Sequence, residues 1–112
     1  MYLAGWGADT GEMSNSLIAL AVTPDPKTGM GHTNRGRYSN PEVDALVVEA
    51  QKTIDDGKRE ELLRKASKLA MADFAVIPLH FEITPWAFKK GLSYKARVDQ
   101  YTLAMEVKRA GS

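Results

Sequence analysis

The chain contains no cysteine among its 112 residues, which excludes disulfides, thiolate metal sites and cysteine nucleophiles. It also lacks a surplus of charge, because 15 Lys and Arg residues face 14 Asp and Glu residues and leave a net charge of +1. No field of one sign therefore exists to gather nucleic acid or anionic lipid. The length excludes a two-domain enzyme, since one domain usually takes about 100 to 150 residues.

Long apolar runs and catalytic motifs are missing too. The best apolar run, 17–22, falls far short of the roughly 20 residues of a membrane span, and the first residues do not form an export signal. There is no Gly-x-Ser-x-Gly elbow and no Gly-x-Gly-x-x-Gly loop. Neither histidine has a partner at metal-ligand spacing: His32 lies in a predicted loop, and His80 is expected to be a buried core histidine. The sequence predicts no catalytic residue, no metal and no cofactor.

Apolar spacing predicts two amphipathic helices joined as a hairpin. Ser39 or Asn40 can cap the first helix, and Pro41 suits its first turn; its apolar stripe consists of Val43, Leu46, Val47, Ala50 and Ile54. The turn at 55–57 ends this helix. The second helix follows at once, with an inward face made of Leu62, Leu63, Ala66, Leu69, Ala70 and Phe74.

Shorter elements are predicted around the hairpin. A short helix covers 16–21, capped by Ser14 or Asn15, and a long loop covers 23–39. Strands are expected at 2–6 and 75–81, which are short apolar runs, and at 101–107, where apolar and polar residues alternate. Because Pro78 has no N–H to donate, the middle strand should be an edge strand or have an interrupted ladder. The predicted fold class is α/β in a larger protein and α+β for this chain alone, a helical hairpin plus a few strands.

Basic residues on the second helix invite a nucleic-acid interpretation. Its bases are Arg59, Arg64, Lys65 and Lys68. Glu60 and Glu61 interleave with them, so a solvated face carrying i,i+4 ion pairs is the favoured interpretation.

The most informative stretch is Gly-Trp-Gly-Ala-Asp at 5–9. It would place the Trp6 indole and the Asp9 carboxylate at the end of a strand, where α/β proteins commonly hold ligands. A packed tryptophan and an aspartate in an Asx-turn explain the same stretch without any ligand. Spacing alone favours this second interpretation and leaves the first open.

Several stretches share their order and spacing with one known family. They are GWGAD at 5–9, RYSNPEVDAL at 37–46, KR at 58–59, DFAVIPLH at 73–80, Trp86, KGL at 90–92, and Asp99 followed by YTL at 101–103. Together they resemble the carboxy-terminal part of family 5 extracellular solute-binding proteins, the peptide, dipeptide and nickel binding proteins of bacterial ABC importers.

The resemblance implies a non-enzymatic receptor of several hundred residues, periplasmic or lipid-anchored, with two lobes that close on a solute and deliver it to an inner-membrane permease. This chain would be its last part, with about 1–84 in one lobe and about 85–112 crossing back to the other. In peptide-binding members the matching aspartate pairs with the ligand's α-ammonium and the matching tryptophan lines the pocket, which implies these roles for Asp9 and Trp6. Peptide is favoured over nickel.

One departure from the family pattern concerns the solute. Many peptide binders follow the aspartate with an acidic residue and a proline, whereas this chain has Thr-Gly-Glu-Met-Ser at 10–14. Two other functions stay open: a small interaction module built on the helical hairpin, and a nucleic-acid binder. We further expect the chain alone to bind no solute measurably and to self-associate, because unpaired strand edges and exposed apolar surface recruit partners.

Overall fold

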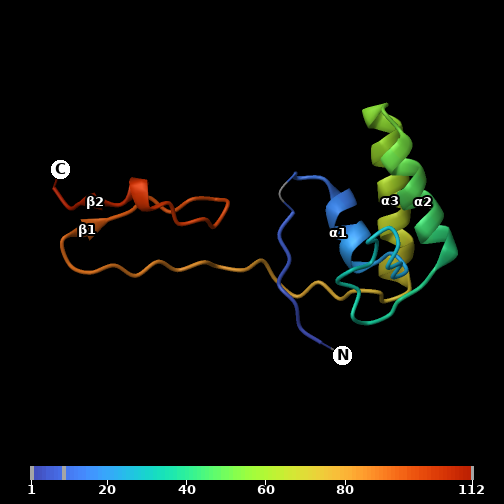
Figure 1. Ribbon diagram of the computed structural model, residues 1–112, viewed down its shortest axis with the longest axis horizontal. Helices are drawn as coiled ribbons and strands as arrows, with labels where there is room; N and C mark the ends of the chain where they lie inside the picture. Colours follow the sequence, from blue (N-terminus) through green and yellow to red (C-terminus); the bar gives the residue numbers. More distant parts are fainter. Residues whose placement is uncertain (1, 9, 112) are drawn as a thin grey trace. The chain divides into compact units, whose positions relative to one another are not determined.

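The computed structural model describes residues 2–8 and 10–111, and the chain divides into two compact units, Met1–Leu79 and His80–Ser112. The first unit contains three helices: α1 at Met13–Leu20, α2 at Pro41–Lys52 and α3 at Asp56–Ala72 (Figure 1). The second contains β1 at Leu92–Ser93, a 3-10 turn at Ala104–Glu106 and β2 at Lys108–Arg109. This content confirms the α+β class.

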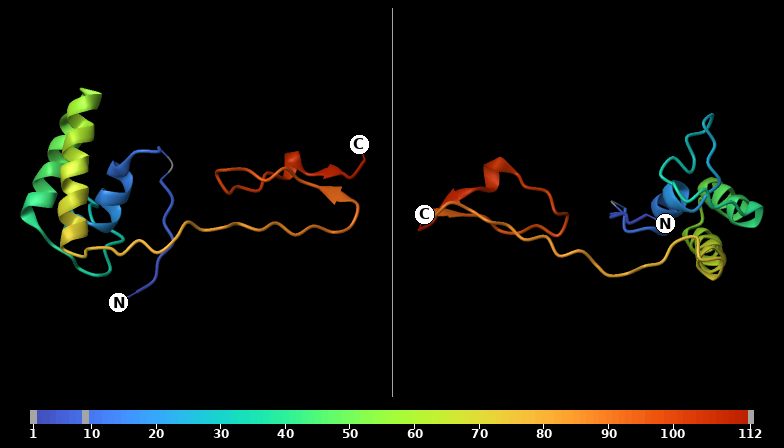
Figure 2. Two further views of the ribbon diagram at one scale, coloured as in Figure 1. Left: turned by 180° about the vertical axis from the view of Figure 1, so that it is seen from behind. Right: turned by 90° about the horizontal axis from the view of Figure 1, so that it is seen from below.

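The core of the first unit lies where the three helices meet. Helices α2 and α3 run side by side, and α1 packs against both of them (Figures 1 and 2). The predicted helical hairpin is therefore confirmed. Buried apolar side chains fill the interface: Leu17, Ala21, Val22, Val43, Val47, Ala50, Leu63, Ala66 and Ala70.

Leu46, Leu62 and Leu69 are partly buried and pack against this core. Two other members of the predicted apolar faces lie outside it. Ile54 is 93% exposed and Phe74 is 77% exposed, because each lies just beyond the end of its helix. The Asp55 side chain accepts a hydrogen bond from the Lys58 N–H at 2.8 Å, so it begins α3 rather than ending α2. The predictions for Ile54 and Phe74 were wrong because the apolar spacing continues beyond the last residue of each helix.

The chain stretch that opens α2 also ties α2 to the end of α3. Asn40 caps α2 by accepting from the Glu42 N–H at 2.9 Å, and its amide donates to Asp73 at 2.7 Å. The Tyr38 hydroxyl donates to the same carboxylate oxygen at 2.6 Å. Burial and this hydrogen bond raise the pKa of Tyr38 to about 12, while the bonds from Tyr38 and Asn40 lower the pKa of Asp73.

The long loop at 23–39 is held by one buried polar side chain. Asn34 is 6% exposed and donates from Nδ2 to the carbonyls of Val22, at 2.9 Å, and Tyr38, at 2.8 Å. Its Oδ1 accepts from the Tyr38 N–H at 3.1 Å. The Asn34 side chain thus joins both ends of the loop. Its backbone partners also provide the hydrogen bonds that a buried amide requires.

Asp44 gives the same loop a second anchor. Its carboxylate accepts from the backbone N–H of Thr23 at 2.9 Å and from the Thr23 hydroxyl at 2.5 Å. The Thr23 and Ser39 hydroxyls are themselves 2.8 Å apart. The predicted loop is therefore confirmed, and it is fastened at its start and its end to α2.

The three predicted strands were wrong. Residues 2–6 and 75–81 have no strand assignment, and 101–107 contains the 3-10 turn. The strands in the described part of the chain are β1 and β2, which pair antiparallel with Leu92 opposite Arg109 and Ser93 opposite Lys108. His80 is exposed rather than buried. Alternation supplies one face of a strand, but a ladder needs a neighbour, and 75–81 has none among the described residues.

The short helix was predicted with the wrong start. Helix α1 begins at Met13, with Glu12 in the capping position and no side-chain capping bond. Ser14 and Asn15, the predicted caps, therefore lie inside the helix. None of the helices in the described residues is long and apolar enough to span a membrane.

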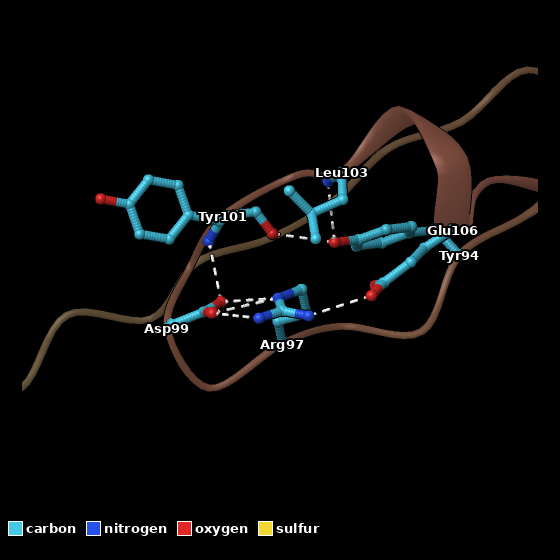
Figure 3. A network of polar contacts seen from close by, with 6 residues as sticks. All are labelled: Tyr94, Arg97, Asp99, Tyr101, Leu103 and Glu106. Carbon is cyan, nitrogen blue, oxygen red and sulfur yellow. Dashed lines mark hydrogen bonds and ion pairs between the residues drawn. The ribbon is translucent and has the colours of Figure 1, made fainter.

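The second unit is organised by a polar network around Arg97 (Figure 3). Its guanidinium forms ion pairs with Asp99 and, at 2.9 Å, with Glu106. These contacts raise the pKa of Arg97 and lower that of Asp99. The Tyr94 hydroxyl donates to the Tyr101 carbonyl at 2.8 Å, so side chains rather than a sheet hold this loop closed.

Candidate functional site

The candidate site begins with Trp6, which lies in the irregular stretch before α1. The residue is 40% exposed, and its indole N–H donates to the Asn15 side chain on α1 at 3.2 Å. The ring of His32, from the long loop, lies 6.3 Å away between centroids at an interplanar angle of 58°. Three segments therefore meet at this indole, which keeps part of its surface open.

A second bond fixes the same stretch to the long loop. The Tyr2 hydroxyl donates to the Thr33 carbonyl at 3.1 Å, next to His32. Tyr2 and Trp6 thus hold the first residues against α1 and the loop, although 2–6 forms no strand. A partly open indole with a hydrogen-bonded N–H is an amphipathic contact surface, which suits a ligand with both apolar and polar parts.

Asp9, the other predicted site residue, lies outside the described residues. Its role in binding an ammonium group stays a prediction, as does the role of Trp6 in lining a pocket. No motif or spacing in the sequence indicates Asn15 or His32 as neighbours of Trp6. His32 lies beside Trp6 because the 23–39 loop folds back onto α1. No local sequence pattern predicts such a contact.

An open groove of about 620 Å³ lies elsewhere, between the start of α1 and the exposed side of α3. Its two arginines have acidic partners: Arg59 pairs with Glu12 at 3.0 Å and with Asp56 at 2.7 Å, and Arg64 pairs with Glu60. The charge of Glu12 raises the pKa of Arg59. This matches the predicted solvated face with paired charges. Trp6 is not in the lining, which consists of Gly11, Glu12, Met13, Asp56, Arg59, Glu60, Leu63, Arg64, Ser67 and Lys68.

Metal-ligating side chains are not gathered at either place. In the described part of the chain, no group of three or more His, Asp or Glu side chains is placed to hold a metal ion. The chemistry that Trp6 and its neighbours offer is noncovalent contact through an aromatic face, an amide and an imidazole.

Comparison with known proteins finds similarity to two kinds of binding protein. The chain is 28% identical over 88 residues to the periplasmic oligopeptide-binding protein OppA of Salmonella typhimurium, which covers 74% of this chain and 15% of that protein. It is 32% identical over 94 residues to the glutathione-binding protein GsiB of Escherichia coli K12, which covers 83% of this chain and 18% of that protein. The chain thus spans less than a fifth of the length of these relatives. No family model matches the chain, and no solved structure matches it significantly.

Proposed function

We propose that this chain is part of the solute-binding receptor of a bacterial ABC importer, a family 5 protein that takes peptides or related amine-bearing solutes. The observation that carries the proposal is the similarity of 74% to 83% of the chain to an oligopeptide-binding and a glutathione-binding protein. Oligopeptides and glutathione share a free α-ammonium group and several amide and carboxylate groups. The proposed receptor binds a solute with that chemistry and performs no catalysis.

Asp9 and Trp6 are the proposed solute contacts. A carboxylate shielded from water needs a cation and hydrogen bonds to offset the cost of burial, and a ligand ammonium supplies both. Trp6 supports this role because the residue is 40% exposed while Asn15 accepts a hydrogen bond from its indole N–H. A ring held in one orientation loses little entropy when a solute packs on it.

The remaining features of the proposal concern the longer receptor. Residues 1–84 belong to one lobe and 85–112 cross back to the other, so that closure of the hinged lobes around the solute stabilises the bound state. The receptor is periplasmic or lipid-anchored and delivers its solute to an inner-membrane permease. The reading frame that contains this chain should then extend several hundred residues upstream and start with a secretion signal.

Calorimetry on the receptor that contains this chain tests the solute contact. Asp9→Ala should weaken binding of glutathione or a short peptide by about 1.5 to 3 kcal/mol, the range for a hydrogen bond to a charged group, which is about 10- to 150-fold in Kd. Asp9→Asn should recover only part of this loss. An N-acetylated peptide should bind weakly to the unmodified receptor and equally weakly to Asp9→Ala, because it lacks the ammonium.

Asp56→Ala is the matched control, since the Asp56 side chain is 88% exposed and lines the groove that does not include Trp6. Its affinity should equal that of the unmodified receptor. Unchanged affinity in Asp9→Ala would return Asp9 to the role of a turn residue. Absence of binding to any peptide by the unmodified receptor would contradict the proposed solute class.

A further inference from the structure

The stretch that carries Trp6 has no backbone hydrogen bonds to hold it. Residues 2–8 belong to neither a helix nor a strand, and none of their backbone groups bonds to another described residue. The orientation of the Trp6 ring therefore depends on what its side chain contacts. Asn15 accepts a hydrogen bond from the indole N–H at 3.2 Å, and the His32 ring lies beside the indole.

Both of these neighbours have fixed positions within the first unit. Asn15 is the third residue of α1, and the same helix buries Leu17 and Ala19, which are 4% and 2% exposed. The His32 ring is held inside the long loop, because its Nδ1 donates to the Gly29 carbonyl at 3.2 Å. The core of the first unit thus fixes the indole through Asn15, although the backbone of 2–8 is irregular.

The residue type at position 15 points to the same conclusion. Asparagine is unfavourable inside a helix, because its side chain competes for backbone groups and prefers capping positions. Helix α1 has no side-chain capping bond, and the Asn15 oxygen bonds to Trp6 instead. Residues that break a local preference are expected at functional sites.

We propose that Asn15 is a positioning residue for the solute, which holds the Trp6 indole so that the carbon face of the ring meets the apolar part of a bound peptide. This role rests on the proposed solute contact of Trp6 and adds a second residue to it. The carbon face suits an apolar group, while the N–H needs an acceptor.

Closure of the receptor explains why the acceptor matters. In the open state water can bond to an exposed indole N–H, so loss of Asn15 costs little. When the lobes close over the solute, water is excluded, and an N–H without an acceptor carries the full cost of desolvation. Asn15 supplies the acceptor in both states, so its effect should appear mainly in solute affinity and only weakly in the free energy of unfolding.

A double-mutant cycle on the receptor that contains this chain tests the role, with trileucine as the probe and calorimetry as the measurement. Asn15→Leu keeps the branched shape but removes the acceptor, and it should raise Kd at least about 5-fold, the factor for a buried donor left unsatisfied. Trp6→Phe removes the donor and should also weaken binding. In the Trp6→Phe background, Asn15→Leu should cost no further affinity, because both partners are then apolar.

Ser16→Ala is the matched control. Ser16 follows Asn15 on α1, and its side chain bonds to none of the described residues, so its substitution should leave Kd unchanged. A second readout needs no solute: NMR of the receptor labelled with isotopic tryptophan follows exchange of the indole N–H with water, and Trp6→Phe identifies the signal. Asn15→Leu should speed this exchange severalfold, and Ser16→Ala should not.

The outcomes separate this role from the solute contact on which it rests. Unchanged affinity or unchanged exchange in Asn15→Leu, while Trp6→Phe weakens binding, would overturn the positioning role and leave the contact intact. Equal losses from Asn15→Leu in both backgrounds would overturn it too, since Asn15 would then act through the fold. Unchanged affinity in Trp6→Phe, or no binding of trileucine to the unmodified receptor, would contradict the contact itself and the positioning role with it.

Discussion

The loop that leads into α2 should depend on one side chain, Asn34. We expect Asn34→Ala to destabilise the first unit more than any other substitution of a polar residue in that loop. The amide is 6% exposed and bonds to three backbone groups, one belonging to Val22 and two to Tyr38. The Thr23 and Ser39 hydroxyls also join the two ends of the loop, but their hydrogen bond is exposed.

The magnitude follows from the bonds that would be lost. A typical hydrogen bond contributes about 0.5 to 1.5 kcal/mol net, so three of them give about 2 to 4 kcal/mol. The upper part of this range applies if the carbonyls of Val22 and Tyr38 stay buried without a partner. Asn34→Asp should be no milder, because it would place carboxylate charge against those two carbonyl oxygens.

Urea unfolding followed by circular dichroism at helical wavelengths measures this loss, because all three helices belong to the first unit. The midpoint should fall while the slope stays the same. Asn15→Ala is the control, since Asn15 makes a single exposed bond of 3.2 Å to Trp6 and should cost no more than about 0.5 kcal/mol. A midpoint for Asn34→Ala within the error of Asn15→Ala would refute the role of Asn34 as the anchor of the loop.

Three further substitutions test the hairpin. Leu63→Ala should cost about 2 to 5 kcal/mol, because Leu63 is 3% exposed; a melting curve that overlays that of the unmodified chain would show that its stripe faces something other than a core. Phe74→Gly should raise the free energy of unfolding by about 1 kcal/mol, because Phe74 has a φ of 56°, a conformation that glycine adopts without strain. Loss of the ring should cost little, since Phe74 is 77% exposed. Phe74→Ala, the control, should give no such gain in the same urea titration. Tyr38→Phe should remove a pH dependence of the free energy of unfolding. Folding raises the pKa of Tyr38 to about 12, above the unfolded value of about 10. The stability that this shift contributes is complete below about pH 10 and is lost as the pH rises toward 12. The stability difference between Tyr38→Phe and the unmodified chain should therefore shrink from pH 10 to 12, and a constant difference would contradict the Tyr38–Asp73 bond. At the acid end the lowered pKa of Asp73 gives stability that is present above its unfolded value of about 3.9 and is lost as pH falls further.

The helical hairpin could be predicted from the sequence because its signals are local. Asn40 and Pro41 form the start of α2 as expected from their capping preferences, and the apolar spacing located Val43, Val47, Leu63, Ala66 and Ala70 in the core. Both misplaced residues, Ile54 and Phe74, lie two positions beyond the last residue of a helix. Helix boundaries are where periodicity is least informative, since a cap can override it within one turn.

The strands could not be predicted in the same way because a strand is defined by its neighbour. Apolar and polar residues alternate at 76–84, but a ladder forms only with a second strand. The stretch at 101–107 alternates as well, yet Arg97 and Tyr94 form side-chain contacts that hold it as a loop. A period of two therefore indicates which side chains would share a face of a strand, while pairing depends on whether a second strand lies beside it.

The candidate site was predicted only in part. The sequence singled out Trp6 through its glycine neighbours, and the structure leaves the indole partly open. Its contacts with Asn15 and His32 depend on a loop folding back across many residues. Such contacts have no sequence signature, because neither spacing nor composition records which loop covers which helix.

The stretches that resemble the family also differ in what they report. Tyr38, Asn40 and Asp44 at the start of α2, and Asp73 at the end of α3, all use their polar groups within the chain. These residues build the hairpin and anchor its loop, so they report on the fold of this part of the chain and carry no information about a solute. Information about the solute must come from groups that stay open to it, and Trp6 is the clearest example in the first unit. A receptor could therefore keep the whole hairpin motif while changing its ligand, which is why the calorimetric test is directed at the stretch 5–9 and not at α2.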